Sequence, residues 1–152
     1  MSKSGSRDKS TFKKILVTVD GSANANRAAA VAIEMARKNR AELTILNVVP
    51  AQATPPAEFV ADPSAYWAAA EEKGREVVDE VAKRAHGLGD VKTAVVNKAS
   101  STVHEIIKFA EKEDIDLIVM GTRGRGGFTK LLLGSVSSGV LNHAHCSVLI
   151  VR

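Results

Sequence analysis

Residues 120–136, MGTRGRGGFTKLLLGSV, combine residue types that can bind phosphate groups. The stretch contains five glycines, two arginines and one lysine, and it has no acidic side chain. Glycine lets the backbone adopt positive φ and lets a ligand come close to the main chain. Consecutive amides can then form an anion site, to which Arg123, Arg125 and Lys130 add positive charge. A flexible surface loop has the same composition, so the position of the stretch in the fold must decide between the two readings.

The elements around this stretch follow from the pattern of apolar residues. Short β-branched runs alternate with longer segments that carry apolar residues at helical spacing. All four prolines fall in residues 50–63, which predicts a loop or a lid there. The pattern predicts strands at 12–20, 41–49, 91–97, 115–121 and 146–152, and helices at 23–39, 64–85, 101–113 and 135–144.

Alternating strands and helices are typical of a parallel sheet covered by helices on both faces. Since crossovers are right-handed, few layouts remain. We predict an α/β fold, a Rossmann-like three-layer sandwich with five parallel strands in the order 3-2-1-4-5. In that order the chain reverses direction between strands 1 and 4, and ligands bind at such switch points. Strand 1 ends at Asp20 and strand 4 at Gly121, so the glycine-rich stretch borders the predicted crevice.

The stretch leads into the predicted helix 135–144, whose N-terminus offers free amides and partial positive charge. Ser135 could bind phosphate through its hydroxyl or could cap this helix, and both roles use the same region. Asp20 could contact a ribose or a divalent cation, or it could only form the Asp-Gly turn after strand 1. No Gly-Lys-Ser/Thr is present, which excludes a Walker A loop, and the glycine spacing does not fit a dinucleotide fingerprint.

Composition and charge limit the number of domains, the kinds of partner and the location that we expect. The 152 residues suit one domain, which we place at 12–152 after a basic, disordered tail at 1–11. The formal charge of +4 comes from residues 1–14, because the other 138 residues carry 16 basic and 16 acidic groups. The folded part is therefore not expected to bind nucleic acid. No apolar run is long enough to span a membrane and no signal peptide is recognisable, so we expect a cytoplasmic protein.

Other residues that could do chemistry have simpler interpretations. The single cysteine, Cys146, excludes an internal disulfide and is interpreted as a small buried apolar residue. His143 and His145 have no third ligand nearby and are interpreted as surface or dimer-edge residues rather than metal ligands. Tyr66 and Trp67 could both belong to a lid, and one of the two is expected to pack in the core beneath the predicted helix 64–85.

The spacing of the glycines is more specific than their number. Gly121, Gly124, Gly134 and Ser135 form the pattern Gly-x2-Gly-x9-Gly-Ser/Thr. This pattern resembles the nucleotide-binding, ATP-binding branch of the universal stress protein family. The segments KKILVTVDGS and LLLGSVSSGVLNHAHCSVLIVR are also similar to that family, and the resemblance covers about residues 12–152. It implies the adenine nucleotide alpha hydrolase-like form of the Rossmann-like fold and a stress-response or regulatory module.

The resemblance also implies a set of binding roles. Asp20 would lie near the ribose and a magnesium ion carried by the ATP phosphates, and Val48 would meet adenine through its backbone. Contacts of Arg123 and Arg125 with phosphate are inferred from their charge, because the family varies at these positions. The remaining implied contacts, to ribose and phosphates, are Met120, Gly121, Gly124, Gly134, Ser135, Val136 and Ser137.

One departure from the family leaves the ligand and the activity open. The family usually has a glycine near the nucleotide before the third helix, where this chain has Ala99 and Ser100. A Cβ there could narrow the pocket, so AMP, cyclic AMP or no ligand are alternatives to ATP. A slow ATPase or an autophosphorylating enzyme is a further alternative, although no water-positioning base or Walker lysine is apparent.

The last strand raises the question of assembly. Strand 5 would form an edge of the sheet, and an apolar edge favours association. Pairing with a second copy about a two-fold axis would cover it. We predict a homodimer through strand 5, Ser147 to Val151, and the family resemblance implies the same.

Overall fold

The computed structural model describes residues 11–51, 55–122 and 133–152. Nearly all of the predicted tail 1–11 lies outside these ranges. The five-stranded parallel sheet has the order β3-β2-β1-β4-β5, which confirms the predicted topology. The elements are β1 (Lys14–Thr18), α1 (Ala23–Asn39), β2 (Glu42–Pro50), the 3₁₀ helix η1 (Ala57–Phe59), α2 (Pro63–Arg84), β3 (Val91–Ala99), α3 (Thr102–Lys112), β4 (Leu117–Gly121), α4 (Ser135–His143) and β5 (Ser147–Val151).

The central strand β1 explains why the sheet is buried on both faces. It pairs with β2 on one side and with β4 on the other. Its residues Ile15, Leu16 and Val17 have no solvent exposure. A continuous β-branched and aliphatic run of this kind suits a strand that helices cover from both faces.

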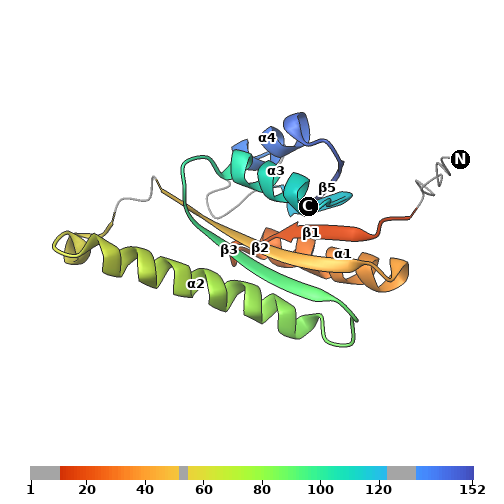
Figure 1. Ribbon diagram of the computed structural model, residues 1–152, viewed down its shortest axis with the longest axis horizontal. Coiled ribbons are helices and arrows are strands. Elements are labelled where there is room, and N and C mark those ends of the chain that lie inside the picture. The colour runs from red at the N-terminus through yellow and green to blue at the C-terminus, as the bar shows by residue number, and fades with distance from the viewer. Residues whose placement is uncertain (1–10, 52–54, 123–132) are drawn as a thin grey trace, which may run out of the picture.

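The helices divide between the two faces of the sheet (Figure 1). Ile15, Val17 and Ile45 belong to the core shared with α1 and α2. Leu16 and Ile118 alternate with them and face the core shared with α3 and α4. This alternation follows from the two-residue period of a strand.

The helix α2 approaches β2 unusually closely at Gly74. A Cβ on this glycine would lie 2.6 Å from Oδ1 of Asn47 and 3.0 Å from a methyl group of Val95. Glycine is therefore required by the packing of the helix on the sheet. None of the helices in the described ranges has the length and the apolar character needed to cross a bilayer.

The N-terminal end of α2 projects past the carboxyl ends of the strands (Figure 1). The expectation that one of Tyr66 and Trp67 packs in the core was wrong, because both side chains are half-buried and belong to neither core cluster. Helical periodicity identifies one side of a helix, but it does not tell where the sheet beneath that side ends. Cys146 also differs from expectation, because it packs against the core and remains partly exposed.

Candidate functional site

A cavity of about 660 Å³ lies at the carboxyl ends of the central strands. Its floor is formed where β1 and β4 diverge, by Asp20 after β1 and by Met120 and Gly121 at the end of β4. This is the switch point that the strand order predicts. The remaining lining residues come from β1 and the residue after it, β2, η1 and the helices α1, α2, α3 and α4: Thr18, Val19, Ala25, Leu46, Asn47, Val48, Val49, Pro50, Phe59, Tyr66, Ala69, Ala70, Lys73, Gly74, Val77, Thr102, Ile106, Val136 and Ser137.

The start of α1 forms one polar border of the cavity. Asp20 Oδ1 accepts a hydrogen bond from the backbone amide of Ser22 at 2.9 Å, and Gly21 between them has φ of 84°. Ser22 Oγ in turn accepts from the amide of Ala25 at 3.2 Å and caps the helix. Asp20 is therefore a turn former, as one reading of the sequence held. Its position in the cavity wall is also compatible with the ligand-binding reading.

The start of α4 forms the opposite border and is built differently. Its N-cap is Gly134, which has no side chain to accept hydrogen bonds from the first-turn amides, and no acidic residue follows in the first turn. The carbonyl of Thr122 accepts from the Gly134 amide and from Ser137 Oγ, both at 2.7 Å. These two bonds join the end of β4 to the first turn of α4. The helix N-terminus is thereby held at the cavity, and no side chain of the described residues caps its first-turn amides.

Gly121 has a packing role in addition to its place in the cavity. A Cβ on this residue would lie 3.0 Å from the backbone carbon of Asn24 in α1. The first glycine of the spacing pattern thus lets the end of β4 pack against the start of α1. The sequence motif showed that a glycine was needed, but not that a neighbouring helix requires it.

The turn before α3 shows how the departure from the family pattern is accommodated. Ala99 is buried and Ser100 is exposed, and neither lines the cavity. Thr102 does line it, while Ser101 caps α3 by accepting from the amide of His104 at 3.2 Å. The side chains at the two departing positions therefore leave the cavity open.

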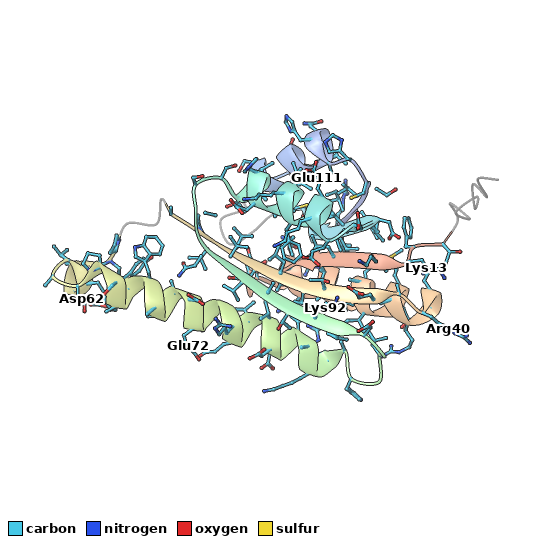
Figure 2. All side chains as sticks on the ribbon, viewed as in Figure 1. Lys13, Arg40, Asp62, Glu72, Lys92 and Glu111 are labelled. Carbon is cyan, nitrogen blue, oxygen red and sulfur yellow. The ribbon has the colours of Figure 1, made fainter. Side chains whose placement is uncertain are left out.

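One face of α2 forms the outer wall of the cavity, and sequence analysis did not identify it. Tyr66, Ala69, Ala70, Lys73, Gly74 and Val77 recur at helical spacing and all line the cavity. On the opposite side of the helix, Glu72 points away from the sheet (Figure 2). Apolar spacing alone cannot distinguish a packed face from a cavity wall, which is why the sequence did not reveal this one.

Asn47 is the unusual polar residue of this wall. Its Nδ2 donates to the carbonyl of Val19 at 2.8 Å, which fastens the end of β2 to the chain leaving β1. Its Oδ1 is buried and has no hydrogen-bond partner among the described residues. This oxygen faces Gly74, so α2 closes over a polar group of the sheet.

The predicted binding residues fall into three groups. The structure brings Asp20, Val48, Met120, Gly121, Val136 and Ser137 together around the cavity. Gly134 and Ser135 stand at the start of α4 beside it. Arg123, Gly124 and Arg125 lie outside the described residues.

The other reactive side chains lie away from this cavity. Burial raises the pKa of the Cys146 thiol, which disfavours the nucleophilic thiolate. His145 lies 3.1 Å from a carboxylate oxygen of Glu111, and Nδ1 of His143 contacts the carbonyl of Gly139 at 2.9 Å. Within the described ranges there is no group of three or more His, Cys, Asp and Glu side chains that could hold a metal.

Comparisons with known proteins agree with this architecture. The universal stress protein MJ0531 of Methanocaldococcus jannaschii is 38% identical over 146 residues, which are 93% of this chain and 82% of that protein. The structure of universal stress protein UspA from Lactobacillus plantarum is 31% identical with a TM-score of 0.73, and covers 93% of this chain and 99% of that one. A universal stress protein solved in complex with cAMP is 24% identical with a TM-score of 0.66, covering 93% and 98%.

The family model named Universal stress protein family matches residues 11–152, which include the whole sheet and all of its helices. Together with relatives above 30% identity over most of both chains, this match confirms the resemblance to the universal stress protein family. The chain belongs to the universal stress protein family.

Proposed function

We propose that this protein binds ATP in the cavity at the carboxyl ends of β1, β2 and β4, and that it acts as a nucleotide-dependent regulatory module. The observation that carries the proposal is the first turn of α4. It opens onto a switch-point cavity with a glycine at its N-cap. Free amides and the positive end of a helix dipole stabilise phosphate groups.

The proposed arrangement assigns the two ends of the cavity to the two ends of the nucleotide. The phosphates would lie at Gly134, Ser135, Val136 and Ser137, and the ribose beside Met120 and Gly121. The backbone of Val48 would then meet the edge of adenine. This backbone is accessible on one side because β1 ends at Thr18, before the level of Val48, so the two strands no longer pair there.

The proposed magnesium ion would arrive with the nucleotide. Mg²⁺ is commonly bound by one or two carboxylates together with substrate phosphates and water. Asp20 supplies a carboxylate at the cavity wall, and no preformed cluster of metal ligands exists among the described residues. Asp20 is thus suited to orient an ion that the phosphates hold, although one of its oxygens also serves the turn to Ser22.

The choice between ATP, AMP and cyclic AMP is left to experiment. The likeness to a protein solved with cAMP, at 24% identity, bears on the fold alone. We favour ATP because the glycine spacing resembles the ATP-binding branch of the family, and because the first turn of α4 lines the cavity.

Isothermal titration calorimetry tests the proposal directly. The protein is titrated with ATP in the presence of Mg²⁺, and separately with AMP and cyclic AMP. ATP should give a saturable heat and should bind more tightly than the other two. Absence of heat with ATP, and no ATP-dependent rise in Tm, would overturn the proposal, whereas tighter binding of AMP would replace ATP as the ligand.

We also propose a homodimer that forms through β5. The two edge strands differ in charge: β3 carries Lys92, while β5 reads SVLIV without a charged residue. Charged side chains on an edge strand oppose association, and their absence permits it. Leu141 on the neighbouring α4 is 46% exposed and would extend such a contact. Sedimentation at micromolar concentration should show a dimer, and a monomer would contradict it.

A further inference from the structure

Aromatic side chains gather at the outer end of the cavity. The sequence holds four phenylalanines, one tyrosine and one tryptophan. Half of these lie in the short segment that contains η1 and the first turn of α2. The ring of Tyr66 meets that of Phe59 at a centroid distance of 5.7 Å and that of Trp67 at 5.0 Å, both edge to face.

These rings are not used to build the core. Phe59, Tyr66 and Trp67 are each half-buried, and none belongs to either core cluster. Phe59 and Tyr66 line the cavity instead. Since aromatic rings are usually among the largest contributors to a core, two of them at the rim of a cavity indicate a contact surface for a ligand.

Two alanines of α2 stand beside these rings. Ala69 and Ala70 follow Tyr66 on the cavity side, and both have small side chains. Larger residues at these two positions would take up volume of the cavity next to Tyr66. The cavity wall therefore combines an aromatic ring with small apolar neighbours, and Lys73 adds a positive charge further along the same face.

We propose that Tyr66, supported by Phe59, is a specificity-determining residue that stacks on the purine base of the bound nucleotide. This inference rests on the proposed nucleotide binding and extends it to the selection of the base. Stacking of a base on an aromatic side chain is favourable for every base, and the larger purine ring gains more contact than a pyrimidine. Tyr66 would therefore favour ATP over CTP.

The test compares three ligands and three variants. ATP, CTP and inorganic tripolyphosphate are titrated into the wild-type protein and into Tyr66→Leu, Tyr66→Phe and Val60→Ala by calorimetry, all with Mg²⁺. Leucine preserves apolar volume and removes the π-face, phenylalanine preserves the face, and Val60 is a 70% exposed neighbour that does not line the cavity. The single tryptophan, Trp67, gives a second readout, because a base on Tyr66 should change its fluorescence.

Tyr66→Leu should weaken ATP about tenfold, weaken CTP less and leave tripolyphosphate unchanged. Tyr66→Phe and Val60→Ala should bind all three ligands like the wild type. Unchanged ATP affinity in Tyr66→Leu, or an equal loss for ATP and tripolyphosphate, would overturn the proposed stacking on Tyr66. Neither outcome would contradict nucleotide binding itself. If the wild type binds none of the three ligands, the proposed function itself is overturned.

Discussion

The helices α1 and α4 begin at the same edge of the sheet, each after a central strand, yet their first turns are built differently. At α1 the chain satisfies its own amides, because Asp20 accepts from Ser22 and Ser22 accepts from Ala25. At α4 the N-cap is Gly134, and the nearby hydrogen bonds run to the carbonyl of Thr122 instead. One helix start is thus capped by side chains, whereas the other is positioned without a side-chain cap from the described part of the chain. The comparison indicates that an anion site depends on what the local side chains leave unsatisfied.

The largest change in ATP affinity is expected from a carboxylate placed at the start of α4. Ser135→Asp puts a negative charge where phosphate is proposed to bind. Losing charge-assisted hydrogen bonds costs about 1.5–3 kcal/mol, so ATP should bind roughly tenfold to a hundredfold more weakly. The same carboxylate should stabilise the helix by about 0.3–1 kcal/mol through its dipole. Calorimetry and chemical denaturation measure the two opposite changes.

The matched control places the same charge at the other end of α4. Asn142→Asp is exposed near the C-terminus of the helix and should leave ATP affinity unchanged. It should lower the free energy of unfolding slightly, because the C-terminal end of the dipole is negative. Equal loss of ATP affinity in both variants would indicate a general charge effect rather than a phosphate-binding site at the first turn of α4.

A second substitution tests the contact between the end of β4 and the start of α1. Gly121→Ala would bring a Cβ within 3.1 Å of three atoms of Asn24, two of them backbone atoms. Overpacking of this kind costs about 1–3 kcal/mol, so the free energy of unfolding should fall by that amount. Gly89→Ala is the control, because a Cβ there meets nothing within 4 Å. Similar denaturation midpoints for both variants would contradict the packing role.

The cap of α1 should affect stability and not the nucleotide. Ser22→Ala removes the acceptor for the amide of Ala25 and should destabilise the protein by about 1 kcal/mol. ATP affinity should change by less than about twofold, which corresponds to less than about 0.5 kcal/mol of binding free energy. A large loss of ATP affinity would show that the start of α1 is also part of the phosphate-binding site.

The smallest effect is expected from making α4 resemble α1. Gly134 has φ of −63° and ψ of 163°, an extended conformation that serine can adopt. Gly134→Ser would supply a side-chain cap, which differs from glycine by only a few tenths of a kcal/mol in stability. The new hydroxyl would compete with phosphate for the same amides, so ATP affinity should fall about twofold to threefold. Tighter ATP binding in this variant would argue against the first-turn amides of α4 as the phosphate-binding site.

The sequence predicted the elements and their order well because these depend on local periodicity. The helix expected at 23–39 matches α1, and the strand order followed from alternation and crossover handedness. The aspartate turn and the serine cap were also recognisable, since their chemistry lies within three residues.

Features that depend on contacts between distant segments were not predictable in the same way. The approach of Gly74 to Asn47 joins residues 27 positions apart, and no local pattern marks it. The stripe from Tyr66 to Val77 has the spacing of a core face, but it borders a cavity because α2 projects beyond the strands. Candidate residues from the glycine motif were easier to find, because that motif is contiguous in sequence.

The central claim is that the first-turn amides of α4, and not those of α1, receive phosphate. Nuclear magnetic resonance of the ¹⁵N-labelled protein tests it by following amide signals during titration with magnesium and inorganic tripolyphosphate, which has no aromatic ring. We predict progressive, saturable shifts for the amides of Ser135, Val136 and Ser137, with the amide of Ala25 unaffected. Shifts at Ala25 without shifts in the first turn of α4 would contradict the account.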